Sequence, residues 1–357
     1  MKKIMSLIAI TAIILNTSTY AQTKKEVTDL PDISVIGNFI GTHTDSKKRF
    51  DVKEIEFSFQ HYLYPSVKAD VFAALHKEES GKRNFELEEA YITFSDLYNV
   101  LVPNSTTNLG LGAIVGSKLL NIGKTNPLHP EQWDFVDRPL VLKNFLGNEE
   151  GLSAEGGQLM YLLPVPFFSQ IELGYWTANT HAEETGEAEL HSGIEYKNRL
   201  FTGRLWNSVP LSETQEFEFG LSYLLGNASA SSSNDKQNVM GIDVTYTKEI
   251  STDQFMKLQS ELYHAKYGEE GERKNQKGAF ISGLYQWNPY YQTGIRFGTL
   301  GKHGGEGNTK NQWSLMVTRK LTDTSKLRFQ YNTGKNIDDT ITVQFVFGMG
   351  PHAHVLQ

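Results

Sequence analysis

Strict alternation of apolar and polar residues runs through most of the chain beyond residue 31. It is clearest at 216–225, where the apolar residues are Phe217, Phe219, Leu221, Tyr223 and Leu225. Successive side chains of a β-strand point to opposite faces, so this period predicts a strand with one apolar and one polar face. The same pattern recurs at 54–60, 67–73, 109–115, 171–175, 240–246 and 341–347. The sequence therefore predicts an all-β protein.

The alternating runs and the segments that separate them predict about sixteen strands. They lie near 32–42, 53–63, 67–76, 85–94, 107–117, 151–163, 168–178, 190–206, 213–226, 237–248, 255–267, 277–287, 291–301, 312–321, 326–334 and 340–349. The connections after even-numbered strands are mostly tight, whereas those after odd-numbered strands are usually longer and polar. Short turns at one end and longer loops at the other are typical of an antiparallel outer-membrane barrel.

A secreted soluble β-sandwich also alternates and also uses Gly and Pro turns, so alternation alone leaves two architectures open. The even strand count, a signal segment and the placement of aromatic residues favour the transmembrane barrel. Aromatic residues gather near the predicted strand ends, as interfacial girdles require: Tyr62, Tyr64, Phe94, Phe167, Phe168, Trp287, Tyr290 and Tyr291.

The first 21 residues are expected to be a signal peptide. Two lysines precede an apolar run at 7–15, and a small-residue cleavage site ends at Ala21. This run falls well short of the roughly 20 apolar residues that a spanning helix needs. We expect export to the outer membrane of a Gram-negative bacterium. The other predicted parts are a periplasmic stub at 22–31, a β-barrel at 32–349 and a periplasmic C-terminal tail at 350–357.

Composition excludes several kinds of chemistry. The 357 residues include no Cys, which excludes disulfides, Cys-ligated metals and a thiol nucleophile. A net charge of -7 gives no electrostatic footprint for nucleic acid. His352 and His354 are weak metal candidates, but two histidines do not supply the three or four ligands of a zinc site. No Gly-x-Ser-x-Gly elbow is present. We therefore predict neither an enzyme nor a cofactor.

One connection is much longer than the rest. If the first strand starts in the periplasm, the segment from Lys118 to Glu150 is the third outward loop, with 33 residues, and every other outward loop is near ten or shorter. A structureless loop of this length is uncommon unless it is functional. Folding into the lumen would give its polar groups partners. We predict a constriction there, and a surface cap is the alternative. The residues expected to face the permeation path are Lys124, Asp134, Asp137 and Arg138.

The same segment carries a family resemblance. The motifs are Gly123-Lys124-x-Asn126-Pro127-x-His129, Trp133-Asp134-Phe135-x-Asp137-Arg138-Pro139-Leu140 and Asn144-Phe145-x-Gly147. They resemble the phosphate-selective porins and their uncharacterised outer-membrane relatives, over about residues 50–175. The resemblance implies a sixteen-stranded, trimeric channel. The sequence shows no recognisable series of basic residues that matches the family, so the resemblance assigns no phosphate-binding residue in this chain.

The polar faces of the strands supply the predicted lining of the lumen. The acids are Glu54, Glu56, Asp70, Glu86, Glu88, Glu172, Glu216, Glu218, Asp243 and Glu261. The bases are Lys68, Arg204, Lys257, Arg296, Lys320 and Arg328. Rings of acids favour cations, whereas anion and phosphate pores use Arg and Lys. The excess of acids therefore predicts a mild preference for cations, which departs from the family resemblance.

Together these features predict an outer-membrane porin for passive diffusion of small hydrophilic solutes or ions. Its expected partners are outer-membrane lipid and these solutes, with assembly as a homotrimer possible and no nucleic acid. Two alternatives stay open: a phosphate- or anion-selective porin, and a structural or adhesive outer-membrane barrel.

Overall fold

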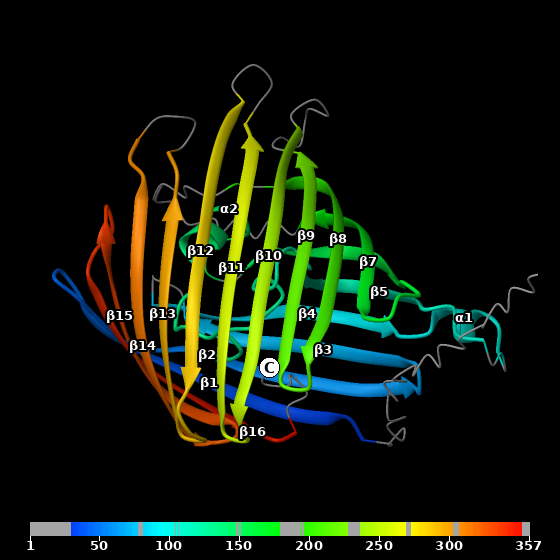
Figure 1. Cartoon of the computed structure of the whole chain (residues 1–357), viewed down its shortest axis with the longest axis horizontal. Coiled ribbons are helices and arrows are strands. Elements are labelled where there is room, and N and C mark those ends of the chain that lie inside the picture. The colour runs from blue at the N-terminus through cyan, green and yellow to red at the C-terminus, as the bar shows by residue number, and fades with distance from the viewer. Residues whose placement is uncertain are drawn as a thin grey trace, which may run out of the picture.

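The chain closes into a single β-barrel (Figure 1). The computed structural model describes residues 30–77, 81–103, 105, 107–147, 149, 151–178, 194, 196–227, 236–268, 273–302 and 307–351. Within these residues each strand pairs antiparallel with its neighbours in sequence, and the last strand pairs with the first. Closure gives every described strand a neighbour on both sides, so the sheet has no edge strand, which a barrel needs in lipid. The predicted all-β transmembrane fold is confirmed.

The barrel has sixteen strands in the described part of the chain. They are β1 (Asp32–Thr44), β2 (Lys48–Tyr64), β3 (Val67–Lys77), β4 (Arg83–Phe94), β5 (Leu111–Leu119), β6 (Ser153–Leu162), β7 (Phe168–Ala178), β8 (Lys197–Ser212), β9 (Gln215–Asn227), β10 (Lys236–Ser251), β11 (Gln254–Tyr267), β12 (Lys274–Gln286), β13 (Tyr291–Leu300), β14 (Lys310–Thr322), β15 (Ser325–Lys335) and β16 (Thr340–Met349). Two short helices, α1 (Leu97–Leu101) and α2 (Leu140–Phe145), lie in connections. Neither is long or apolar enough to cross a membrane, and the same holds for every helix among the described residues.

Strand β8 departs most from the sequence prediction of 190–206. It continues to Ser212 and pairs with β9 beyond the predicted end at residue 206. Pro210 belongs to this extension and lies beside a register shift, where the missing N–H of proline is tolerated. The connection from β7 to β8 consequently covers 179–196. The prediction that every other outward loop has about ten residues or fewer is therefore wrong.

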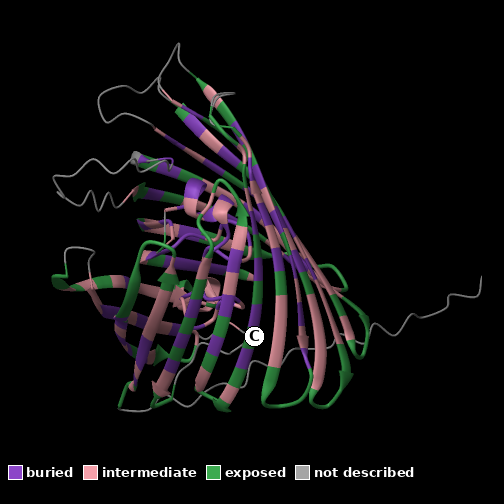
Figure 2. Ribbon diagram, turned by 90° about the vertical axis from the view of Figure 1, so that its left-hand side faces the viewer, coloured by how far each residue is buried: buried purple, intermediate pink, exposed green. Residues whose placement is uncertain are grey.

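The two faces of the barrel have opposite polarity. Along β9, Leu221 is 48% exposed and Tyr223 is 38% exposed, whereas Ser222 between them is 6% exposed. Figure 2 shows this alternation of exposed and buried residues along most strands. The exposed side chains are the apolar ones, which is the reverse of a soluble sandwich and is what a lipid-facing surface requires. The polar side chains point into the lumen.

A β-bulge interrupts the alternation in β4. The register shifts there, so that Phe72 pairs with Glu89 while the next residue of β3 pairs with Leu87. Glu88 is the extra residue. Leu87 is 55% exposed on the outside, and Glu89 is 3% exposed on the inside. The bulge therefore adds Glu89 to the lumen face, an acid that simple alternation misses.

The connection between β5 and β6, here called the lumen loop (Leu120–Leu152), folds inside the barrel and carries α2 (Figure 1). Many of its apolar residues form one buried cluster with the barrel wall and with two residues that precede β8. The members are Leu120, Ile122, Val141, Leu142, Phe145, Leu146 and Leu152 from the loop, Ile194 and Tyr196 from the connection before β8, and Ala154, Trp176, Leu200, Leu224, Val239, Tyr263, Ala265, Tyr267, Phe280 and Leu300 from the strands. Trp133 and Phe135 are also buried, at 7% and 4% exposure. The predicted inward fold of the third loop is observed, and the surface cap is excluded.

The lipid-facing surface can be tested with arginine at two depths. Leu221→Arg, in the middle of β9, should lower the free energy of unfolding by about 2–4 kcal/mol. Ile250→Arg is the matched control, because Ile250 is 50% exposed and lies beside the turn between β10 and β11. Ile250→Arg should lower the free energy of unfolding by only about 0–1 kcal/mol, since a side chain near the membrane interface reaches water. Both values come from denaturant unfolding in lipid vesicles, and equal losses would contradict the proposed membrane depth.

Candidate functional site

The lumen loop is bonded to the inner wall on nearly opposite sides of the barrel. Contacts outside α2 include those of Asn121 with Glu172, Gly123 with Ser222, Lys124 with Glu218, Thr125 with Glu261, His129 with Glu56 and Glu89, Asp134 with Lys257, Asp137 with Arg296 and Phe135 with Arg328. Strands β2 and β11, which carry Glu56 and Glu261, lie seven strands apart in one direction and nine in the other. The loop therefore crosses the lumen, and its wall contacts define the candidate site.

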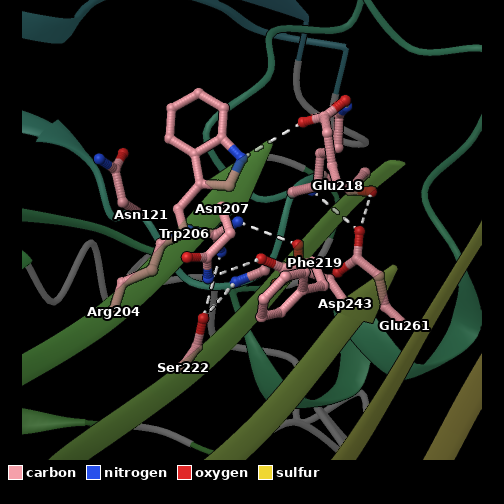
Figure 3. A network of polar contacts seen from close by, with 12 residues as sticks. Asn121, Arg204, Trp206, Asn207, Glu218, Phe219, Ser222, Asp243 and Glu261 are labelled. Carbon is pink, nitrogen blue, oxygen red and sulfur yellow. Dashed lines mark hydrogen bonds and ion pairs between the residues drawn. The ribbon is translucent and has the colours of Figure 1, made fainter. Parts of the chain in front are cut away.

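The contacts on β8, β9 and β10 form a compact polar network (Figure 3). Arg204 donates to Asp243 at 3.0 Å and to Ser222 at 3.2 Å. Ser222 also accepts a hydrogen bond of 3.0 Å from the backbone N–H of Gly123. Lys124 forms an ion pair with Glu218, which further accepts from the indole of Trp206 at 3.2 Å. The wall charges of this network, Arg204, Glu218 and Asp243, are thus paired with each other or with the loop.

Glu261 on β11 is a fixed acceptor for the start of the loop. It is fully buried and accepts the backbone N–H of Thr125 at 3.0 Å and the hydroxyl of Tyr263 at 2.5 Å. Gly123 permits this close approach. Its φ is +65°, and a Cβ there would lie 2.3 Å from Oε2 of Glu261. A glycine is therefore required where the loop turns onto the wall.

The opposite part of the loop meets a basic wall. Arg296 on β13 donates to the carbonyl of Asp137 at 2.7 Å and to its Oδ1 at 2.6 Å. Arg328 on β15 donates to the carbonyl of Phe135 at 3.0 Å and also to that of Trp133. Burial would raise the pKa of Asp137, but Arg296 and nearby Lys143 outweigh burial and hold that pKa below its usual range. Asp137 is therefore ionised at neutral pH and anchors the loop.

The four residues predicted to form the constriction divide into two groups. Lys124, Asp134 and Asp137 lie where the loop meets the wall, and their side chains keep 17%, 20% and 18% exposure. Arg138 is only 1% exposed and lies inside the loop. It donates to the carbonyl of Leu146 at 3.0 Å and to the side chain of Asn126 at 2.8 Å. Burial lowers the pKa of Arg138 to about 10, so it remains charged at neutral pH. Arg138 therefore lies in the interior of the loop.

The predicted wall residues lie on the inner face, but most of them are engaged or buried. Asp70 accepts from Lys68 at 2.5 Å and from Gln60 at 2.7 Å, and Lys320 donates to Gln286 at 2.7 Å. The buried members are Glu54, Glu56, Asp70, Glu172, Arg204, Asp243, Glu261, Arg296 and Arg328. Glu86 and Glu216 differ, because they are at least partly exposed and form no ion pair with any other described residue.

His129 is the most prominent site residue that sequence reasoning missed. It is 2% exposed, with Nδ1 2.9 Å from Glu56 and Nε2 2.8 Å from Glu89. Its ring packs against Phe72, with the ring centroids 5.0 Å apart. Burial alone would lower the pKa of His129, but Glu56 and Glu89 raise it well above its usual value. The motif around Gly123 and Lys124 contained this histidine, but its partners lie on distant strands. The other histidine candidates, His352 and His354, and the predicted signal peptide lie outside the described residues.

No protein-family model matches the chain. An uncharacterized protein from Aquifex aeolicus (strain VF5) is 26% identical, over 90% of this chain and 79% of that protein. Among solved structures, the barrel is similar to OprB of Pseudomonas putida, with a TM-score of 0.61 and 11% identity over 90% of this chain and 94% of that one. For the anion-selective porin from Comamonas acidovorans, the TM-score is 0.58 and the identity 10%, over 91% of this chain and 100% of that one. For the outer-membrane channel DcaP of Acinetobacter baumannii, the TM-score is 0.57 and the identity 12%, over 90% of this chain and 96% of that one.

These similarities show the fold, which is that of outer-membrane porins. The predicted porin-type β-barrel fold is thereby confirmed. The narrower resemblance to phosphate-selective porins is not confirmed, because the similar structures belong to several kinds of porin at low identity.

The anchoring of the loop can be tested at Asp137. Asp137→Asn removes the charge that Arg296 faces, and Arg296 is 3% exposed. Breaking a buried pair should destabilise the docked loop by on the order of 3 kcal/mol. Limited proteolysis within residues 120–152 should then become faster while the barrel stays folded.

The control is Glu149→Gln in the same loop. Glu149 pairs with Lys143 at 2.6 Å, but its side chain is 55% exposed. An exposed pair contributes about 0–1 kcal/mol, so cleavage should stay close to the unaltered rate. Similar cleavage of both variants would contradict the anchoring role of Asp137.

Proposed function

We propose that this protein is an outer-membrane porin through which small hydrophilic solutes or ions diffuse passively, and that it performs no catalysis. One observation carries the proposal: a loop of the chain crosses the lumen of a porin-type barrel and is held by wall residues on nearly opposite sides. A loop that only covered the outer mouth would not need such contacts. The lumen loop is the proposed constriction.

The constriction should govern permeation more strongly than the rest of the wall. The Coulomb interaction between an ion and a fixed charge strengthens as water is excluded from the space between them. Lys124, Asp134 and Asp137 combine a position on the loop with partial exposure. We therefore assign the path-facing role to these three residues and give Arg138 the role of holding the loop's fold.

We further propose a mild preference for cations. The arginines Arg204, Arg296 and Arg328 are buried in contacts with the wall or the loop, which removes three of the six predicted lumen bases from contact with a permeating ion. Glu86 and Glu216 stay accessible and without a cationic partner among the described residues. Acidic groups that face a pore favour cations. Preference for anions or phosphate, as the sequence resemblance implies, is the competing outcome. Assembly as a homotrimer is also part of this proposal.

The constriction is tested by shortening the loop. In a variant with residues 126–140 replaced by a short Gly-Ser linker, single-channel conductance in planar bilayers should rise several-fold. Ion preference should weaken, because the narrowest zone is lost. If the unaltered protein and the folded variant both give no discrete channel events, the barrel is structural or adhesive instead.

Selectivity is tested separately with Glu86→Gln combined with Glu216→Gln. The reversal potential in a salt gradient should move toward zero, while the conductance changes little. Glu213→Gln is the control, because Glu213 lies in the turn between β8 and β9. A reversal potential that shows anion preference in the unaltered protein would contradict the cation preference and support the alternative.

A further inference from the structure

A histidine and two glutamates converge where the lumen loop meets β2 and β4. Nδ1 of His129 lies 2.9 Å from Oε2 of Glu56 and 3.9 Å from Oε2 of Glu88. One ligand atom from each of the three residues can be chosen so that all lie within 4.8 Å of one another. In a zinc site, Zn–N and Zn–O distances are about 2.0–2.2 Å, so two ligand atoms are at most about 4.4 Å apart. Small side-chain adjustments bring the three atoms to that spacing.

The two carboxylates offer oxygen atoms that accept no hydrogen bond from a donor among the described residues. Glu56 is 1% exposed, and its Oε1 accepts no hydrogen bond from any described residue. Oε2 of Glu88 is also buried without a hydrogen bond in the described part of the chain. The other oxygen of Glu88 lies 3.0 Å from Nε2 of His76, which holds the carboxylate with Oε2 toward His129. A buried carboxylate that stays ionised requires a donor or a cation, because burial removes its water.

The surroundings add to this demand for positive charge. Glu54, Glu89 and Glu131 are also buried in this region, at 5%, 3% and 6% exposure. These three residues and the two carboxylates of the cluster outnumber the histidines His76 and His129. If all five carboxylates are ionised, these seven groups carry a net negative charge even with both imidazoles protonated. A divalent cation would compensate it.

The second nitrogen of His129 is held as in known metal sites. Nε2 lies 2.8 Å from Oε2 of Glu89, and the other oxygen of Glu89 accepts the backbone N–H of Leu119. A metal-binding histidine usually donates its remaining N–H to such a carboxylate, which fixes the tautomer and the ring orientation. Here that bond leaves Nδ1 directed at Glu56 and Glu88. This feature is independent of the unsatisfied oxygens.

We propose that His129, Glu56 and Glu88 bind one divalent transition-metal ion of the zinc class, with Nδ1 of His129 and one oxygen of each glutamate as ligands. The imidazole ligand favours zinc-like ions over Mg²⁺ and Ca²⁺, which prefer all-oxygen sites. The ion joins the lumen loop to β2 and β4 and braces the loop in its docked position. The competing arrangement is a protonated His129 that donates to both Glu56 and Glu89.

The test measures metal binding, so its result is independent of channel activity. The folded full-length protein in detergent is treated with EDTA, dialysed and titrated with ZnCl₂ against a chromophoric chelator. One equivalent of Zn²⁺ should bind, and saturating Mg²⁺ or Ca²⁺ should not displace it. Zn²⁺ should also slow proteolysis within residues 120–152. His129→Gln should abolish this binding, and Glu88→Gln should weaken it at least tenfold.

Two controls separate the site from other carboxylates and histidines. Glu86→Gln lies on the same strand outside the cluster and should bind Zn²⁺ like the unaltered protein. His352→Ala combined with His354→Ala tests the C-terminal tail and should also retain the bound equivalent. Glu88→Gln tests the site without removing the histidine, since the side chain of Glu88 is 19% exposed and its loss should not prevent folding.

Three results would overturn the proposal. The first is that the folded, unaltered protein binds no Zn²⁺, which would leave the protonated histidine as the arrangement. The second is binding that persists unchanged in both His129→Gln and Glu88→Gln. The third is binding that disappears only with the two tail histidines. A crystal grown with Zn²⁺ should show one anomalous-scattering peak between the three proposed ligands, and a peak elsewhere alone would also reject the site.

Discussion

The charge-matched docking of the lumen loop on the inner wall is the constraint on which the rest of the interior depends. Irregular backbone at membrane depth is tolerated only where protein or water satisfies its polar groups. Arg296 and Arg328 meet this requirement by donating to loop carbonyls, while Glu261 accepts the N–H of Thr125. The wall therefore supplies hydrogen-bond partners that the loop's own secondary structure does not provide.

The inner wall has an acidic region and a basic region, and the loop presents a complementary group to each. Strands β2 to β4 carry mainly acids, and β13 to β15 carry several bases that face the lumen. The loop presents His129 to the acids, and Asp137 to Arg296. Many of the lumen charges thus hold the loop in place. Their total number is a poor guide to ion preference, which depends on the few groups that remain accessible.

The opposite polarity of the two faces explains why the strands could be predicted. A period of two residues is a local property, and lipid outside with polar partners inside imposes it on every strand. The prediction failed where the backbone departs from that period. The bulge in β4 placed Glu89 on the inner face, and the pairing of β8 with β9 carried the strand past Pro210. Both departures depend on how a strand pairs with its neighbour, and the local pattern of apolar and polar residues does not reveal them.

By itself the sequence determined the all-β barrel, its sixteen strands and the inward fold of a loop too long and too polar for a simple connection. Only the tertiary structure decided which charges meet. Asp137 and Arg296 are 159 residues apart in sequence, and His129 and Glu89 are 40 apart. The same loop motif that suggested four path-facing residues contained Arg138, which the fold places inside the loop. Alternation fixes the face on which a side chain lies, whereas its partner depends on barrel closure and on the path of the loop across the lumen.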